Sequence, residues 1–395
     1  MRVAMATMRA VQIRGEWTPR PDAKLTPEEI DGRWAYDATR AWRHPVWEVV
    51  DQPVPQVGGP HDVVVRSRAV GVCGSDAHLY ETDDDGYVLL PYRVRLPLVP
   101  GHELAGEVVE VGSAVQGLAP GDAVAVTTLQ YCGSCAACGA GMPAHCTEGA
   151  DRGFNLDGGM AEYVVSRDMN LRPLNALRER FGEQEVFEIG ALSEPASVAY
   201  LGMFARAGGV RPGGVAVVHG CGPIGLAAIA LARAAGAGNV IAFATNPARC
   251  ELAKSMGADE AYDVRALAHD GIGAGEVVLE RTQGLGADMA VEAAGSARTV
   301  LPEIERSLAV GAKVVLLGSQ SGIAPMATMA YMVKGASIYG SIGNIGGTDP
   351  VIALHASGRI DLRPMVTDRY PLADAVAAVR RATESSAAKV LVLPG

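Results

Sequence analysis

Four of the seven cysteines lie within one short stretch of the sequence. They are Cys132, Cys135, Cys138 and Cys146, with the spacing C-x2-C-x2-C-x7-C. A structural zinc ion takes four tetrahedral ligands, and a short loop brings thiolates close enough together to supply them. Because the cysteine count is odd and no secretory signal is visible, a disulfide framework is the weaker interpretation. The spacing therefore predicts a closed structural zinc site.

A second group of ligand-type residues is spread more widely along the chain. Cys73 stands alone, His102 and Glu103 follow in the segment PGHE, and Glu194 lies in the segment LSEPAS. A thiolate, an imidazole and one or two carboxylates are enough to hold zinc with one position open for catalysis. Taken singly, each residue is better explained by a core thiol, a buried histidine or an acid at a helix N-terminus. Because a zinc loop and a nucleotide motif accompany them, we expect a catalytic zinc ion.

A glycine-rich motif of the form G-x-G-x-x-G follows the apolar run 215–218. It reads Gly220-Cys221-Gly222-Pro223-Ile224-Gly225. The first glycine allows a tight turn, the second lets the backbone approach a pyrophosphate, and the third lets helix and strand pack closely. The helix expected at 224–235 offers its free N–H groups and positive dipole end to the phosphates. The motif predicts a dinucleotide-binding site.

The next expected strand ends without the acidic residue that usually binds the ribose hydroxyl groups of NAD. Ala244 stands there, and no acidic residue occurs between Gly225 and Glu251. Without that carboxylate a 2′-phosphate is not repelled, and Thr245, Asn246 and Arg249 are placed in the sequence to bind it. An arginine on a free helix surface is the alternative interpretation of Arg249. We expect that NADP is preferred or accepted, with NAD as the other cofactor.

These residues lie in two stretches of the chain with different sequence patterns. Up to about residue 190 the chain has short β-branched runs bounded by glycine, proline or aspartate, which predicts an irregular β-rich domain. From about residue 215 strands and helices alternate, which predicts βαβ units around a parallel sheet. Short strands return near the end. We expect an α/β fold with a zinc-binding domain at 1–195 and 340–395 and a doubly wound dinucleotide-binding domain at 196–339.

Composition limits the class of partner. The 395-residue chain has a net charge of −10 and no stretch dense in lysine and arginine, which argues against a nucleic-acid partner. Its most apolar stretch, 215–235, contains histidine, arginine, proline and glycines, so we expect no membrane span. The first residues carry arginines without an uninterrupted apolar run. We therefore expect no secretory signal and a cytoplasmic protein.

Together these features resemble the zinc-dependent medium-chain dehydrogenases over essentially the whole chain. The resemblance implies a GroES-like catalytic domain, a Rossmann domain and two zinc ions per chain. The catalytic zinc ligands of the family correspond to Cys73, His102 and Glu103, with Glu194 as fourth ligand or as partner of a water molecule. The structural ligands correspond to the four clustered cysteines. The combination of GHE with SEP is similar to the polyol branch of the family.

The same resemblance assigns roles around the catalytic zinc. Zinc makes an alcohol more acidic, and hydride then passes from the alcohol carbon to the nicotinamide. Ser75 is expected to accept the hydroxyl proton, and His78 is expected to relay it towards solvent. Asp76 is expected to hydrogen-bond His102 and so fix the orientation of its ring.

Two segments indicate a narrower substrate class. The front stretch 24–45 and the insertion 81–103 resemble a branch that oxidises cyclic polyol ketones. We therefore expect a polyol substrate, a cyclitol or inosose, with Arg152 and Asn155 contacting its hydroxyl groups. A sorbitol- or threonine-type dehydrogenase, or a catalytically silent nucleotide-binding scaffold, is the alternative. The family also implies a homodimer or homotetramer, often through the edge strand near 337–341.

Overall fold

The computed structural model describes residues 6–319 and 323–395, and the chain divides into two compact units. The first unit comprises Met1–Glu194 and Val366–Gly395, and the second comprises Pro195–Met365. The first five residues, which belong to the region where we expect no secretory signal, lie outside the described residues.

The division differs from the predicted boundaries at one place. The first boundary lies within one residue of the prediction, but residues 340–365 belong to the second unit rather than the first. One contact of this segment within the second unit is a hydrogen bond of 3.2 Å that the Ser197 hydroxyl donates to the Thr348 hydroxyl. The segment therefore packs with the unit that contains Ser197.

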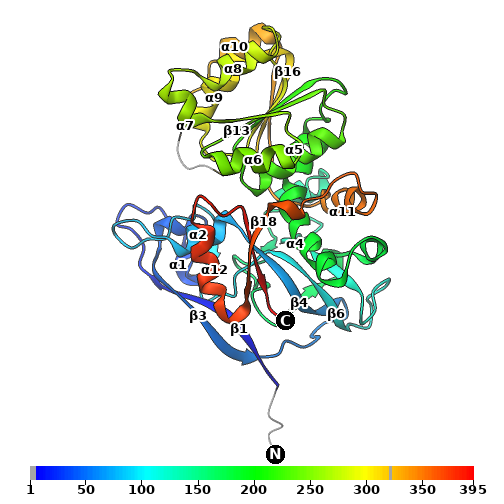
Figure 1. Ribbon diagram of the computed structural model, residues 1–395. Helices are drawn as coiled ribbons and strands as arrows, with labels where there is room; N and C mark the ends of the chain where they lie inside the picture. Colours follow the sequence, from blue (N-terminus) through cyan, green and yellow to red (C-terminus); the bar gives the residue numbers. More distant parts are fainter. Residues whose placement is uncertain (1–5, 320–322) are drawn as a thin grey trace, which may run out of the picture. The chain divides into compact units, whose positions relative to one another are not determined.

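The first unit is built on a seven-stranded, mainly antiparallel sheet (Figure 1). Its order is β11-β7-β6-β4-β19-β18, and β10 also pairs with β4. The strands are β4 (Asp62–Val72), β6 (Glu103–Val111), β7 (Ala123–Val126), β10 (Tyr163–Arg167), β11 (Leu171–Pro173), β18 (Val366–Pro371) and β19 (Lys389–Leu393). Their valine-rich runs suit a half-buried pleated surface. β19, which follows the second unit in the sequence, lies antiparallel to β4 with Val390 opposite Val72.

The front stretch and the insertion form one ordered region of this unit. Its elements are β1 (Thr7–Trp17), α1 (Pro27–Gly32), β2 (Trp34–Ala35), β3 (Trp42–Pro53) and β5 (Val94–Arg95). β1 pairs with β3 along its length, and β2 pairs with β5. The rings of Trp17 and Trp42 meet edge-on with centroids 5.1 Å apart, and Trp42 and Trp47 belong to the core of the unit.

Short helices and strands complete the first unit. They are α2 (Gly74–Tyr80), α3 (Ala136–Gly139), β8 (Leu129–Gln130), β9 (Ala150–Asp151) and α12 (Ala375–Ala382). The helix α4 (Glu183–Tyr200) contains the division between the two units. β8 and β9 flank the cysteine-rich loop and pair with each other, so the two ends of this loop are held together.

The second unit contains a six-stranded parallel sheet of order β14-β13-β12-β15-β16-β17 (Figure 1). The strands are β12 (Val215–His219), β13 (Asn239–Ala244), β14 (Glu260–Asp263), β15 (Ala287–Glu292), β16 (Leu308–Leu316) and β17 (Ser337–Gly340). The helices are α5 (Pro223–Ala234), α6 (Pro247–Ser255), α7 (Val264–His269), α8 (Ala274–Arg281), α9 (Ala297–Arg306), α10 (Thr328–Lys334) and α11 (Thr348–Ala356). This is the doubly wound arrangement that the alternating pattern predicts. Among the described residues, no helix has the length and apolar character needed to cross a membrane.

Candidate active site and metal centres

Cys73, His102 and Glu103 are brought together by two neighbouring strands of the first unit. β4 ends at Val72, and Cys73 follows as the N-cap residue of α2. His102 precedes β6, which begins at Glu103 and pairs with β4 so that Glu103 lies opposite Gly71. Because the pair is antiparallel, the end of β4 lies beside the start of β6. One potential ligand atom from each of the three residues lies within 4.8 Å of the others.

Gly71 makes room for the carboxylate of Glu103. A Cβ atom at this position would lie 1.9 Å from Oε2 of Glu103. Real Cβ atoms do not approach other atoms so closely, so any side chain at Gly71 would displace the carboxylate from the cluster. The position of Glu103 therefore depends on this glycine.

The cluster combines a half-buried thiol, Cys73, with buried side chains, and it is rich in negative charge. His102, Glu103 and Asp76 are 5%, 1% and 2% exposed. Burial alone would lower the pKa of His102, but the negative charges of Cys73, Asp76 and Glu194 raise it to about 10. Burial also raises the pKa of Glu194 to about 7 and the pKa of Asp76. Sulfur, nitrogen and oxygen ligands held in such a field fit a zinc ion.

Lys389, which the sequence analysis did not single out, is part of this cluster. Its Nζ lies 2.6 Å from each carboxylate oxygen of Glu103 and donates a hydrogen bond to the carbonyl oxygen of Val72 over 3.0 Å. The side chains of Lys389 and Glu103 are each 1% exposed. The feature of the sequence that could have pointed to Lys389 is that it is a charged residue at the start of the apolar run KVLVL.

Glu194 approaches the cluster from α4. Its Oε1 accepts a hydrogen bond from the Thr128 hydroxyl over 3.1 Å. Glu194 is not one of the three residues whose ligand atoms lie within 4.8 Å of one another, although its charge acts on His102. Its role as fourth ligand or as partner of a water molecule stays a prediction.

Ser75 and His78 both lie on α2, three residues apart and therefore on neighbouring positions of the helix surface. The Ser75 hydroxyl oxygen is buried and has no hydrogen-bond partner in the part of the chain that the structure describes. The His78 side chain is 52% exposed, and its Nδ1 lies 3.9 Å from a carboxylate oxygen of Glu81. A buried hydroxyl group followed by an exposed imidazole suits transfer of a proton outward. The proton roles of Ser75 and His78 stay predictions.

Asp76 does not make the hydrogen bond to His102 that we expected. Its Oδ2 accepts the backbone N–H of Cys73 over 2.9 Å, because the carboxylate caps the free N–H at the start of α2. Nδ1 of His102 is buried and has no hydrogen-bond partner among residues 6–319 and 323–395. Asp76 therefore acts on His102 through its charge and on Cys73 through the helix cap.

Arg152 and Asn155 both make hydrogen bonds within the fold. Arg152 is 2% exposed, and its guanidinium donates to the carbonyl oxygens of Asp157 and Val165 over 2.7 and 3.1 Å. Oδ1 of Asn155 accepts the backbone N–H of Asp151 over 2.6 Å. These partners give both side chains a role in shaping the loop. The predicted contacts with substrate hydroxyl groups are untested, and the burial of Arg152 weakens its part in them.

An ion pair anchors the same loop to the insertion. Nε and Nη2 of Arg93 lie 2.8 and 2.6 Å from Oδ2 of Asp151, and the Tyr92 hydroxyl donates to the same oxygen over 3.1 Å. The Tyr92 ring meets the Phe154 ring edge-on, with centroids 5.1 Å apart. The Phe154 ring in turn packs on the ring of His102 at 4.9 Å. The insertion therefore supports a candidate zinc ligand through Phe154.

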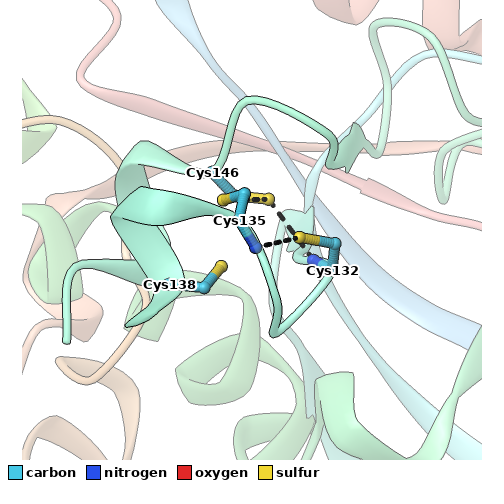
Figure 2. Close-up of side chains that lie close together, drawn as sticks. All are labelled: Cys132, Cys135, Cys138 and Cys146. Atoms are coloured by element: carbon cyan, nitrogen blue, oxygen red, sulfur yellow. Dashed lines mark hydrogen bonds between the residues drawn. The ribbon is translucent and has the colours of Figure 1, made fainter. Parts of the chain in front are cut away.

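The four clustered cysteines converge as the spacing predicts (Figure 2). One sulfur from each of them lies within 4.8 Å of the others. The loop also directs backbone N–H groups at the sulfurs, since Cys132 donates to Cys146 over 3.3 Å and Cys135 donates to Cys132 over 3.2 Å. Backbone hydrogen bonds lower the pKa of Cys135 to about 6. Backbone hydrogen bonds also lower the pKa of Cys132, whereas burial raises the pKa of Cys138 to about 12. Four convergent sulfurs, two of which favour the thiolate form, fit a structural zinc ion.

The glycine motif forms the turn between β12 and α5. At Gly220 φ is +96°, and a Cβ atom there would lie 2.6 Å from the backbone nitrogen of Ala294. A Cβ atom at Gly225 would lie 1.8 Å from the carbonyl oxygen of Gly220. At Gly222, the N-cap of α5, no atom lies within 4 Å of an added Cβ, so space remains in front of the helix N-terminus. The turn therefore fits a dinucleotide pyrophosphate, with Pro223 and Ile224 in the first turn of α5.

The segment after β13 brings Arg249 back to the glycine turn. β13 ends at Ala244, and Asn246 caps α6 by accepting the backbone N–H of Arg249 over 2.9 Å. Nη1 of Arg249 donates to the carbonyl oxygen of Cys221 over 2.9 Å. Arg249 therefore lies beside the nucleotide motif and not on a free helix surface. Binding of a 2′-phosphate by Thr245, Asn246 and Arg249 stays a prediction.

Two protein families match the sequence. Residues 59–176 match the alcohol dehydrogenase GroES-like domain, and residues 223–353 match the zinc-binding dehydrogenase family. Scyllo-inosose 3-dehydrogenase of Thermotoga maritima is 36% identical over 98% of this chain and 100% of its own length. D-xylulose reductase A of Aspergillus niger is 33% identical over 87% of this chain and 92% of its own length.

Solved structures show the same fold over the whole chain. A Thermotoga maritima structure described as an alcohol dehydrogenase has a TM-score of 0.92 and 35% identity, covering 98% of this chain and 100% of its own. A Sinorhizobium meliloti structure described as a zinc-binding dehydrogenase bound to NADP has a TM-score of 0.78 and 26% identity, covering 99% and 100%. The predicted GroES-like and Rossmann folds are thus confirmed. The protein is an oxidoreductase, and its chain belongs to the zinc-dependent medium-chain dehydrogenases.

Proposed function

We propose that this dehydrogenase oxidises a secondary hydroxyl group of a polyol, a cyclitol or inosose, with NADP or NAD as hydride acceptor. The observation that carries the proposal is the cluster of Cys73, His102 and Glu103, in which Cys73 is half-buried and the other two are buried, and whose sulfur, nitrogen and oxygen atoms suit a catalytic zinc ion. Zinc in this cluster supplies Lewis acidity, which lowers the pKa of a hydroxyl group.

The side chains of α2 then handle the proton. Ser75 accepts the proton of the substrate hydroxyl group, and His78 passes it to solvent. The buried position of the Ser75 hydroxyl and the exposure of His78 support this direction of transfer. Glu194, held by Thr128, serves as fourth metal ligand or as partner of a water molecule.

Two relatives support the choice of a polyol. The likeness to scyllo-inosose 3-dehydrogenase extends over 98% of the chain, so it includes the front stretch and the insertion, and it favours a cyclic substrate. The likeness to D-xylulose reductase A supports an acyclic polyol as the second candidate. The Arg93–Asp151 pair, which joins the insertion to the loop over His102, supports a role for the insertion in shaping the substrate site.

The cofactor proposal depends on Arg249. Its position beside the glycine turn and the absence of an acid at the end of β13 support acceptance of a 2′-phosphate. The Sinorhizobium meliloti structure bound to NADP supports the same choice. Replacing Arg249 with alanine should lower kcat/KM with NADP roughly tenfold and leave NAD turnover nearly unchanged, because NAD has no 2′-phosphate to receive the charge-assisted bonds of the guanidinium. Equal losses with both cofactors would assign Arg249 to the turn rather than to the phosphate.

We also propose a homodimer or homotetramer. α10 exposes Met329, Met332 and Val333, which are 64%, 74% and 73% exposed, and β17 is an edge strand of the sheet in the second unit. An exposed apolar patch and an open strand edge each support association between copies. Light scattering after size-exclusion chromatography measures the mass, and Met332→Glu should shift it towards the monomer.

A substrate panel and a metal analysis test the proposed function together. Nicotinamide reduction is followed with scyllo-inosose, myo-inositol, sorbitol, xylitol, threonine and ethanol, each with NAD and NADP. Activity on the cyclitols supports the proposal, and activity on sorbitol or xylitol alone supports the acyclic alternative. Zinc analysis should give two ions per chain, whereas one ion per chain without turnover indicates a nucleotide-binding scaffold that retains only its structural metal.

A further inference from the structure

The insertion begins with a tight hairpin, residues 82–89, which follows α2 in the chain. Inside the hairpin, Oδ1 of Asp83 accepts the backbone N–H of Tyr87 over 2.9 Å. At its end, the backbone N–H of Leu89 donates a hydrogen bond to the carbonyl oxygen of His78 over 2.8 Å. The hairpin therefore brings the chain back to α2, the helix that carries Ser75 and His78.

Leu89 differs from its apolar neighbours in exposure. Tyr87, Val88 and Leu90 are 6%, 1% and 5% exposed, whereas Leu89 is 38% exposed. A single exposed leucine on a protein surface needs no function, so the exposure alone decides nothing. The position of Leu89 is more informative, because its backbone is bonded to that of His78, whose side chain is 52% exposed. An apolar surface thus lies next to the proposed proton relay.

Arg20, which lies between β1 and the front stretch, fixes the hairpin in place. Its guanidinium lies over the Tyr87 ring, 3.8 Å from the ring centroid, and forms an ion pair with Asp83. Its Nε donates a hydrogen bond to the carbonyl oxygen of Thr39 in the front stretch over 2.9 Å. A planar guanidinium that stacks on a ring and also binds a carboxylate fixes both groups in direction, which a lysine ammonium group does less well.

Further hydrogen bonds join the front stretch to the remainder of the insertion. The backbone N–H of Ala38 donates to the carbonyl oxygen of Tyr92 over 3.0 Å, and the indole N–H of Trp42 donates to that of Val94 over 3.2 Å. The two segments therefore form one ordered structure beside α2. Leu89 is presented by this structure and not by a free loop, so little conformational entropy is lost when a ligand packs against it.

We propose that Leu89 is a specificity-determining residue that packs against the apolar face of a cyclic polyol, and that Arg20 is the positioning residue that fixes its hairpin. This inference rests on the proposed function and deepens it. In a cyclitol most hydroxyl groups are equatorial, so the C–H bonds of the ring form an apolar face. An extended polyol turns hydroxyl groups in all directions and has no such face. Contact with Leu89 therefore stabilises a bound ring more than a bound chain.

The test measures steady-state kinetics of the full-length, zinc-containing protein with scyllo-inosose, myo-inositol and sorbitol. Leu89→Ser should raise KM for the two cyclic polyols roughly tenfold, because a lost apolar contact weakens binding by about this factor. kcat should stay nearly unchanged, since the contact is the same in the ground state and the transition state. KM for sorbitol should also stay nearly unchanged. An equal change with cyclic and acyclic substrates, or no change with either, would overturn the inference.

Leu285→Ser is the matched control for this substitution. Leu285 is an exposed leucine of the second unit, 74% exposed, and its replacement should leave all three KM values unchanged. A shift of the same size in Leu285→Ser would show that the effect of Leu89→Ser is not local.

Arg20→Ala tests the positioning role. It should lower the preference for cyclic polyols in the same direction as Leu89→Ser, whereas a purely structural role of Arg20 would change turnover of cyclic and acyclic polyols equally. Arg20→Lys keeps the charge and should restore part of the preference, and it takes the place of Arg20→Ala if that variant does not fold. Arg14→Ala, which breaks an exposed ion pair with Glu48 in the same unit, is the control. An unchanged preference in folded Arg20 variants overturns the role of Arg20.

The same measurements separate failure of the inference from failure of the proposed function. If the unchanged protein oxidises none of the three polyols, or prefers sorbitol, the proposed cyclic substrate is wrong. If the unchanged protein prefers the cyclic polyols and folded Leu89→Ser keeps that preference, the proposed function stands and only the role of Leu89 is overturned.

Discussion

The two candidate metal centres of the first unit are built in opposite ways. Cys132, Cys135, Cys138 and Cys146 come from a single loop, and among them only Cys146 is buried. The active-site cluster takes its groups from the start of α2, the start of β6, α4 and β19, and its His102 and Glu103 are almost fully buried. A loop can organise four thiolates largely by itself, whereas the active-site cluster requires the assembled sheet. The first arrangement serves stability, and the second creates a charged interior that can do chemistry.

Their surroundings differ as well. The sulfurs of the cysteine loop receive backbone N–H groups of the loop itself. Charged side chains, namely Asp76, Glu194 and Lys389, surround the active-site cluster. Because charge interactions are strong away from water, small changes there should alter reactivity more than stability. The following predictions test this contrast.

Removing Cys73 should affect catalysis most. We expect Cys73→Ala to lower kcat/KM by about 10³-fold or more, since metal Lewis acidity contributes several kcal/mol to the barrier. The unfolding midpoint should change little, and zinc should fall from two ions to one per chain. Cys250→Ala, which removes a buried cysteine of the second unit, is the matched control and should keep both ions. If Cys73→Ala instead loses much of its stability but keeps its activity, the cluster around Cys73 does not have the catalytic role that distinguishes it from the cysteine loop.

Removing Cys138 should affect stability first. Cys138→Ala is expected to lower the unfolding midpoint by roughly 5–10 °C, which corresponds to about 2–3 kcal/mol for a unit of this size. Protein that remains folded should keep most of its kcat, because the loop supplies no group to the reaction. Thermal unfolding and zinc content measure the two effects. If kcat falls as steeply as in Cys73→Ala, the two centres do not have separate roles.

The Arg93–Asp151 pair connects the two centres and should have an intermediate effect. Asp151 belongs to β9 at the base of the cysteine loop, while Phe154, three residues later, packs on His102. The two side chains of the pair are 14% and 6% exposed. Asp151→Asn should lower the free energy of unfolding by about 1–3 kcal/mol and raise KM a few-fold, because the loop shifts over His102.

An exposed ion pair gives the control for this prediction. Arg306 and Glu276 are each 50% exposed, so Glu276→Gln should change stability by less than about 0.5 kcal/mol. Denaturant unfolding with steady-state kinetics gives both quantities. Equal effects of the two substitutions would show that the Arg93–Asp151 pair does not connect the centres.

The smallest effect concerns the metal-free cysteine loop. The pKa of Cys135 is lowered to about 6 by backbone hydrogen bonds, so its thiolate persists down to about pH 6 and is lost below it. Iodoacetamide should therefore modify Cys135 in the chelator-treated protein with half-maximal rate near pH 6. Cys221, whose pKa burial raises to about 12, should stay unmodified at neutral pH. Mass spectrometry of the labelled peptides measures both rates, and zinc should protect Cys135.

The two centres also differ in how far the sequence predicts them. The convergence of the cysteine loop follows from spacing alone, because all four cysteines lie within fifteen residues. Cys73, His102 and Glu103 could be proposed from their types and from the family resemblance, but Lys389 could not. It reaches Glu103 only because β19 pairs with the end of β4, which also pairs with β6.

Two local predictions failed or weakened for related reasons. The carboxylate of Asp76 had a nearer donor than His102, the backbone N–H of Cys73 at the start of α2. The guanidinium of Arg152 donates hydrogen bonds to carbonyl oxygens inside the fold, although arginine is usually exposed. In both cases the choice of partner depends on backbone groups whose position the sequence pattern does not specify.

The place of β19 in the sheet has a consequence for biosynthesis. A ribosome makes β4 and β6 early, then the whole of Pro195–Met365, and only afterwards the strand that carries Lys389. Until that strand arrives, the end of β4 at Val70–Val72 lacks the strand that pairs with it, and Glu103 has no ammonium partner. The second unit is continuous in sequence and can fold during translation, whereas the first must wait. Catalytic competence is therefore acquired late, after both units have emerged, and the nascent chain carries an unfinished active site until then.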